Sequence, residues 1–114
     1  MKLLTKSIRN QLIENYRKQQ SEGEEIDFKP IVKLFTPDAG ATWLLTELNP
    51  EHNVAFGLCD LGLGFPELGY VSLEEIESIR GGLGLPVERD RYFEAKKRLS
   101  EYAVEAREKE RICA

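Results

Sequence analysis

The sequence predicts one small α+β domain with a mainly antiparallel sheet of three or four strands and about three helices. Three observations predict this class: an amphipathic helical repeat at the start, a central run of β-rich segments separated by short turns, and two helix signals after them. The length of 114 residues is typical of one domain. No linker divides the chain, so we expect residues 1–114 to form a single unit.

Capping residues and apolar spacing define the expected helices. Thr5 can cap a first helix that runs to about Gln20, and its apolar residues recur every four positions: Leu4, Ile8, Leu12 and Tyr16. Ser72 followed by Glu75 forms a capping box for a second helix. A third helix should open at Ser100.

The end of the chain looks different from its middle. Residues 107–114 carry charges without an apolar stripe, so this tail is predicted to fray into solvent. Before the last helix, residues 87–93 can form either an edge strand or an extended loop.

Strands are expected at residues 29–36, 42–48 and 54–61, where β-branched and aromatic residues are frequent. Tyr70 and Val71 add a short fourth strand. The segments 42–48 and 54–61 are joined by a short turn, so they should pair as an antiparallel hairpin.

The two faces of this hairpin differ. With the turn centred on Glu51, one face is mostly apolar and is the expected core side: Thr42, Leu44, Thr46, Leu48, Val54, Phe56, Leu58 and Asp60. The other face mixes residue types: Trp43, Leu45, Glu47, Ala55, Gly57 and Cys59. Either a helix covers this second face or a partner docks on it. Helix cover is favoured, because a small sheet needs cover on at least one face.

Composition narrows the classes of function. The net charge of -4 argues against broad attraction to nucleic acid or anionic membranes. No apolar run approaches the roughly 18–20 residues of a membrane span, and the first residues turn polar too soon for a signal peptide. Cys59 and Cys113 make no disulfide framework, so the expected location is the cytoplasm.

Four carboxylates lie near predicted strand ends and turns: Asp38, Glu47, Asp60 and Glu67. Carboxylates gathered in this way can hold a hard metal ion or divide acid and base roles, and Asp38 and Asp60 are the candidate metal ligands. Carboxylates in turns also arise from local backbone bonding. Without a second ligand type, the sequence predicts no metal site and no cofactor.

Two further patterns could indicate a catalytic or a nucleic-acid-binding site. Cys59 is a candidate nucleophile only if His52, the single histidine, reaches it, and the hairpin pairing places the two several residues apart. A basic cluster with interleaved aromatics resembles a single-strand nucleic-acid surface: Arg89, Arg91, Tyr92, Phe93, Lys96, Lys97 and Arg98. Acidic residues between these cations are typical of a solvated face instead.

Three strings carry a family resemblance: VKLFTPDAGATWLLTEL at 32–48, AFGLCDLG at 55–62 and PELGYVSL at 66–73. They resemble a family catalogued as domain of unknown function number 2958. The resemblance implies short bacterial proteins, often found on plasmids and other mobile elements. It supplies neither a reaction nor catalytic residues. Small acidic proteins in such settings often bind host proteins, including restriction and other defence factors.

The sequence therefore favours a non-enzymatic binding or regulatory accessory protein of a mobile element that acts on a host protein. Its expected contact surface comprises Trp43, Glu47, Glu67 and Tyr70. One alternative is a small carboxylate- or metal-dependent hydrolase, and another is a weak nucleic-acid-binding module. The expected partner is a protein, with nucleic acid and membrane both disfavoured and the oligomeric state left open.

Overall fold

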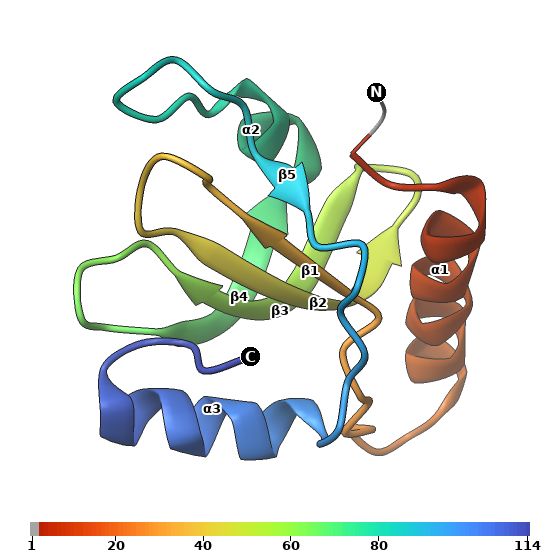
Figure 1. The fold of residues 1–114 in the computed structure, drawn as a ribbon. Coiled ribbons are helices and arrows are strands. Elements are labelled where there is room, and N and C mark those ends of the chain that lie inside the picture. The colour runs from red at the N-terminus through yellow and green to blue at the C-terminus, as the bar shows by residue number, and fades with distance from the viewer. Residues whose placement is uncertain (1–2) are drawn as a thin grey trace.

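The computed structural model describes residues 3–114 as an antiparallel sheet with helices on both of its faces (Figure 1). The five strands lie in the order β4-β3-β2-β1-β5. In chain order the elements are α1 Lys6–Ser21, β1 Val32–Phe35, β2 Thr42–Asn49, β3 Val54–Asp60, β4 Glu67–Ser72, α2 Leu73–Ser78, β5 Glu88–Arg89 and α3 Leu99–Lys109. The predicted α+β class is confirmed.

The predicted strand count of three or four is wrong, because the sheet has five strands. The added strand is β5, which pairs with β1 through only two residues, Glu88 and Arg89. It lies within residues 87–93, for which the sequence left an edge strand and an extended loop open, and only these two residues of that segment pair as a strand. The strand expected at Tyr70 and Val71 is also longer than predicted, because β4 pairs with β3 along all six of its residues.

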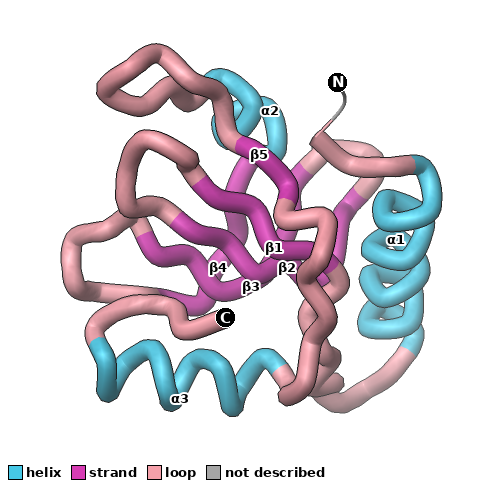
Figure 2. The backbone as a smooth tube through the Cα atoms, in the orientation of Figure 1, coloured by secondary structure: helices cyan, strands magenta, loops and turns pink. Residues whose placement is uncertain are grey.

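One face of the sheet is covered by α1 and α2 (Figure 2). Thr5 caps α1 as predicted, since its hydroxyl accepts a hydrogen bond from the Ile8 N–H at 3.1 Å. Ser72 caps α2 in the same way, accepting from the Glu75 N–H at 3.3 Å. The core on this side joins buried residues of both helices, the sheet and the flanking loops: Leu4, Leu12, Val32, Leu34, Trp43, Leu45, Leu48, Ala55, Leu73, Ile76 and Val87.

The opposite face packs against α3. Its buried core comprises Leu44, Leu58, Leu99, Tyr102, Ala103, Ala106 and Ile112. No helix formed by residues 3–114 is long and apolar enough to cross a membrane.

The chain end is fastened rather than frayed, which corrects the prediction for residues 107–114. Helix α3 continues to Lys109, and the chain then returns beside the sheet (Figure 1). Ile112 is buried, and its N–H donates to Oδ2 of Asp60 at 3.0 Å. The Lys33 side chain also donates to the Ala114 backbone oxygen at 2.6 Å, so contacts from β1 and β3 hold this segment rather than a helical stripe.

The hairpin register is the predicted one in its first half and shifts in its second. Trp43 pairs with Cys59 and Leu44 with Leu58, but a bulge between Leu45 and Glu47 adds one residue to β2. Beyond the bulge Leu48 pairs with Ala55 instead of the expected Val54. Within β2, Glu47 and Leu48 therefore lie on the faces opposite to those listed from the sequence, whereas the residues of β3 keep their faces.

Specific contacts hold the bulge. The Asn15 side chain in α1 donates to the Thr46 carbonyl at 3.0 Å, and the Thr46 hydroxyl donates to the Phe56 carbonyl at 3.4 Å. Gly57 is required opposite the bulge, because a Cβ atom there would lie 2.0 Å from the Leu44 carbonyl oxygen. Bulges increase the local twist and re-aim side chains, and this one moves Glu47 to the α3 side of the sheet.

Candidate functional site

The four residues of the contact surface expected from the sequence do not form one exposed surface in the structure. Trp43 is 1% exposed and packs in the core between the sheet and the α1–α2 layer. Its assignment to a contact surface is therefore wrong, and the favoured alternative of helix cover holds for this face. Strict alternation along β2 places residues 43, 45 and 47 on one face. The bulge after Leu45 moves Glu47 to the other face.

The other three residues divide between the two faces. Glu67 pairs with Cys59 and shares the side of α1 and α2, whereas Glu47 and Tyr70 both pair with Phe56 from opposite neighbouring strands. Residues paired directly across antiparallel strands project to the same face. Glu47, Phe56 and Tyr70 therefore form one row across β2, β3 and β4 on the α3 side.

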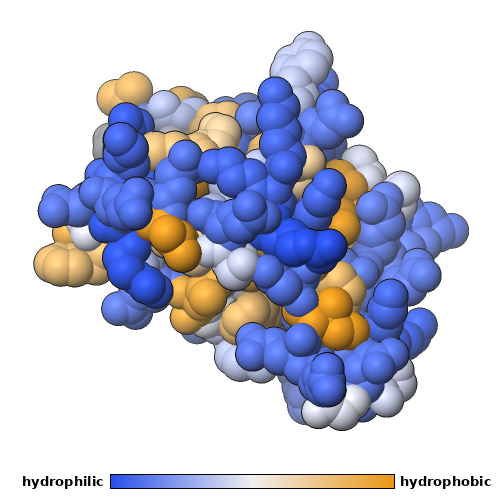
Figure 3. Space-filling view, turned by 90° about the horizontal axis from the view of Figure 1, so that it is seen from below, coloured by the Kyte–Doolittle hydropathy of each residue, from blue (hydrophilic) through white to orange (hydrophobic). Residues whose placement is uncertain are grey.

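Exposed apolar side chains gather around β4 and the loop that leads into it. We call this group the β4 patch; its members, all exposed, are Leu61, Leu63, Phe65, Leu68 and Tyr70. Seen from below, apolar groups stay uncovered between the polar ones (Figure 3). Singly exposed apolar residues are ordinary in folded proteins, but several close together mark an interaction surface.

Tyr70 is the member of this patch whose ring contacts Phe56. It is 79% exposed, and its ring lies 5.0 Å from that of Phe56 at an angle of 58°. This tilted geometry is a favourable one for aromatic pairs. Phe56 is half-buried, so it supports Tyr70 from one side and leaves the remainder of the tyrosine ring open.

A cavity and a carboxylate border the patch. The cavity, of about 560 Å³, lies between the start of β4 and the end of α3 and is lined by Gly64, Phe65, Pro66, Glu67, Leu68, Arg107 and Glu110. At the other end of the Phe56 row, burial and then the Glu25 carboxylate raise the pKa of Glu47. The patch thus has an apolar centre and a polar border.

Two of the four candidate carboxylates bind backbone groups. Asp60 is buried and accepts hydrogen bonds from the Gly62 N–H at 2.8 Å and the Ile112 N–H at 3.0 Å. Asp38 in the β1–β2 turn accepts from the N–H groups of Leu83 at 2.8 Å and Leu85 at 3.3 Å. Both side chains fasten loops to the sheet.

The four carboxylates do not converge. Asp38 lies in the β1–β2 turn, Glu47 in β2, Asp60 at the end of β3 and Glu67 at the start of β4. Within residues 3–114, no group of three or more histidine, cysteine, aspartate or glutamate side chains is placed to hold a metal ion. The convergence of at least three of these carboxylates, which the hydrolase alternative requires, is not found among the described residues.

Cys59 is equally poorly placed for nucleophilic chemistry. It packs at the edge of the α1-side core, and burial raises the pKa of its thiol to about 11. His52 is exposed in the β2–β3 turn. A reactive cysteine needs a lowered pKa or an adjacent base.

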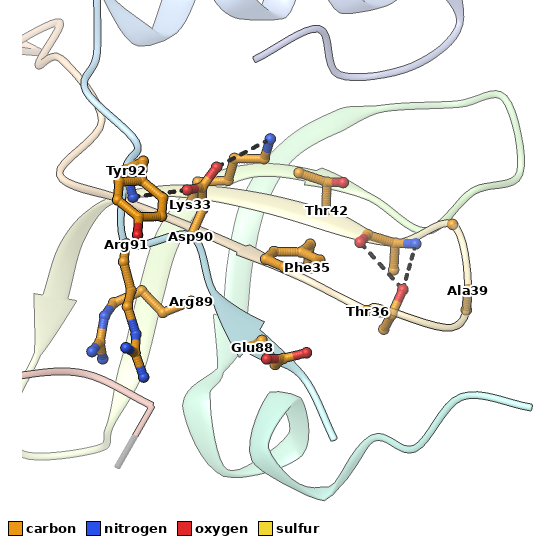
Figure 4. Close-up of a pocket in the computed structure, with 12 residues that line it drawn as sticks. Lys33, Phe35, Thr36, Ala39, Thr42, Glu88, Arg89, Asp90, Arg91 and Tyr92 are labelled. Carbon is orange, nitrogen blue, oxygen red and sulfur yellow. Dashed lines mark hydrogen bonds and ion pairs between the residues drawn. The ribbon is translucent and has the colours of Figure 1, made fainter. Parts of the chain in front are cut away.

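A second concave site lies at the opposite edge of the sheet, beside β5 (Figure 4). It is a cavity of about 570 Å³ between β1, the β1–β2 turn and residues 88–92. Arg89 and Arg91 project to one side, while Lys33 and Asp90 project to the other, with Lys33 Nζ 3.7 Å from Asp90 Oδ2 (Figure 4). Acidic and basic groups alternate along this strand, so the site carries little net charge.

The basic side chains expected to favour nucleic acid do not lie together in the folded protein. Tyr92 is exposed next to Arg91 at the β5 cavity, but Lys97 pairs with Glu105 at 2.6 Å and Arg98 donates to the Asp27 carbonyl at 2.7 Å. The cations of residues 89–98 therefore do not form one continuous surface.

Fold and site together define a small α+β domain with an exposed apolar patch beside one edge of its sheet. The chain belongs to the family described as "Protein of unknown function (DUF2958)", whose model matches residues 3–113. No curated protein and no solved structure matches the chain. The sequence predicted Tyr70 as a contact residue, placed Phe56 on the core face and did not name Phe65 or Leu68 as candidates; the alternation of Leu68 and Tyr70 along β4 was the available signal.

Proposed function

We propose that this protein is a non-enzymatic binding module that contacts another protein through the β4 patch. The observation that carries the proposal is the exposure of Phe65 and Tyr70, each 79% accessible, with Tyr70 held against Phe56. Aromatic side chains that are already ordered before binding make good anchors, because less conformational entropy is lost when they are buried.

The border of the patch supports the same interpretation. Glu47 lies on the same face as Tyr70, at the other end of the Phe56 row, and Glu67 lines the cavity beside Phe65 and Leu68. Protein interfaces commonly surround an apolar centre with polar groups. Following the setting that the family resemblance implies, we propose that the partner is a host protein met in the cytoplasm.

The proposal is tested with a surface double variant, Phe65→Ser with Tyr70→Ser. The wild-type protein and the variant are each used as bait in an affinity pull-down from the native host, and captured proteins are quantified by mass spectrometry. We expect the variant to capture at least tenfold less of a protein that the wild type captures specifically, since anchor residues supply most of the binding free energy.

A matched control separates the patch from general surface change. Leu83→Ser with Val104→Ser removes two apolar side chains of 82% and 55% exposure that lie outside the patch, and it should retain the captured protein. Circular dichroism melts should show all three proteins folded. Equal capture by the patch variant and wild type, or equal loss in the control, contradicts the proposal.

A further inference from the structure

Strand β4 is an edge strand with an open side. It is the terminal strand of the sheet and pairs with β3 along its whole length. In an antiparallel sheet, alternate residues of such a strand direct their N–H and C=O groups outward. Within residues 3–114, no other strand pairs with this outer side.

The sequence of β4 lacks the usual protection of an edge. Its six residues read ELGYVS, with one charged residue at the first position and neither lysine nor proline. Its pairing with β3 runs without a bulge from Glu67 to Ser72. Natural proteins normally shield exposed edges with such devices, because an unshielded edge pairs with another strand.

From this edge we infer that β4 pairs antiparallel with β4 of a second copy of the chain, joining two five-stranded sheets into one continuous sheet. The inference deepens the proposed function and rests on its assignment of the β4 patch as a protein-contact surface. According to this inference, one partner that the surface contacts is a second copy of the chain.

The register follows from symmetry. Two antiparallel strands related by a twofold axis place residues of the same face opposite each other, so the axis passes through a residue position. An axis at Gly69 sets Leu68 opposite Tyr70 of the second copy, twice, and sets Glu67 opposite Val71. Both aromatic rings then gain an apolar neighbour.

Charge supports this register. The two Glu67 carboxylates are displaced along the strands by four residues, or about 14 Å at 3.4 Å per residue, so like charges do not oppose each other. An axis at Tyr70 instead sets Leu68 opposite Ser72 and pairs fewer apolar side chains. The strand is therefore complementary to itself, and no basic residue from a different protein is needed to balance it.

The decisive test is a disulfide at the axis. Residues directly opposite in an antiparallel pair have Cα atoms about 4.5–5.5 Å apart, within the range that a disulfide spans. A Cβ atom added at Gly69 meets no other atom within 4 Å, so Gly69→Cys should be tolerated. The variant is made together with Cys113→Ser and oxidised with a glutathione redox buffer.

Gly23→Cys and Gly82→Cys, in the same background, are matched controls because their added Cβ atoms also meet nothing within 4 Å. We expect Gly69→Cys to form the covalent dimer at least tenfold faster than either control. Sedimentation equilibrium should show concentration-dependent dimers of the wild type, and Leu68→Lys should weaken them at least tenfold by placing a charge opposite Tyr70.

Either of two results overturns the inference: a wild type that stays monomeric at every concentration, or a Gly69→Cys variant that crosslinks no faster than the controls. These results are separable from the fate of the proposed function. A monomeric protein whose patch variant still loses its captured partner refutes self-pairing alone, whereas a crosslinked dimer that captures nothing refutes binding to a host protein alone.

Discussion

The two edges of the sheet are built in opposite ways. Strand β4 has six residues, one of them charged, and it carries Leu68 and Tyr70 of the β4 patch, both exposed. Strand β5 has only two residues, both charged, and is followed by Asp90 and Arg91. Short, charged edges resist pairing and long, uncharged ones favour it. The contrast within one sheet points to β4 as the side that meets other chains.

Each edge also depends on a different anchor. The β4 side relies on the bulge at Thr46, which brings Glu47 to the same face as Phe56. The β5 side relies on Asp38, whose carboxylate holds the loop before β5 against the β1–β2 turn. Disturbing these anchors one at a time shows whether the two edges behave independently.

The largest effect is expected from Gly57→Ala. The added methyl would meet the Leu44 carbonyl oxygen at 2.0 Å, so the backbone of β2 or β3 must move. Overpacking of this kind costs about 2–3 kcal/mol of the free energy of unfolding, which urea denaturation measures. The bulge supports the row to which Tyr70 belongs, so self-association through β4 should weaken as well.

Gly69→Ala is the matched control for this prediction. It lies next to Gly57 on β4, its Cβ atom meets nothing within 4 Å, and removing a strand glycine should change the free energy of unfolding by less than about 1 kcal/mol. Equal stability of the two alanine variants would show that the bulge does not need Gly57.

A smaller effect is expected from Asp38→Ala. The variant loses the acceptor for the Leu83 and Leu85 N–H groups, but it also removes Oδ1, a buried oxygen without a hydrogen-bond partner among the described residues. We expect a net loss of about 1–2 kcal/mol and faster hydrogen exchange at those two amides.

The same variant tests whether the edges are independent. Self-association through β4 should be unchanged in Asp38→Ala, because the loop at residues 81–86 belongs to the β5 side. Glu94→Ala, at an exposed position in the following segment, serves as the control for stability. A drop in association comparable with that of Leu68→Lys would mean that the two edges are coupled.

The smallest effect is expected from Glu47→Gln. Because burial raises the folded-state pKa of Glu47 above the unfolded value, the unfolded chain releases this proton first as pH rises. The wild type therefore loses stability between the unfolded and folded pKa values, and the variant does not. The side chain is only half-buried, so the gain at neutral pH should stay below about 1 kcal/mol.

Urea denaturation of both proteins from pH 4 to pH 8 checks this sign. The difference in free energy of unfolding, variant minus wild type, should grow as pH rises and then level off. A difference that shrinks with rising pH would mean that Glu47 is stabilised as a carboxylate in the folded protein.

The sequence predicts the parts of this fold that depend on local patterns. Thr5 and Ser72 cap helices as expected, because capping needs only residues three positions apart. The pairing of Trp43 with Cys59 also follows from the turn. The sequence left an edge strand open for residues 87–93 but could not say that only Glu88 and Arg89 would pair. The hydrogen bond from Ile112 to Asp60 was not predicted, because it joins residues distant in the chain.

The candidate site shows the same division. Tyr70 was predicted to be part of a contact surface and is exposed, but Trp43 was assigned to that surface and is core. Trp43 lies on the face that the sequence predicts, and it is core because α1 and α2 cover that face. The bulge, which Asn15 of α1 and Gly57 hold, accounts only for the separation of Glu47 from Trp43. Strict alternation along β2 cannot reveal a contact with a helix thirty residues earlier.

The extra residue at Thr46 acts on β2 as a frameshift acts on a coding sequence. Before it, the odd-numbered residues Trp43 and Leu45 face the α1 core; after it, the even-numbered Leu48 does. Deleting Thr46 would join Leu45 directly to Glu47, and the pairs of Glu47 with Phe56 and of Leu48 with Ala55 would stay as they are. A strand that kept Thr46 in regular alternation would instead turn Glu47 into the α1 core and Leu48 to the α3 side. In a variant that changes the length of β2, the face of each side chain should therefore be assigned separately for the residues before and after Thr46.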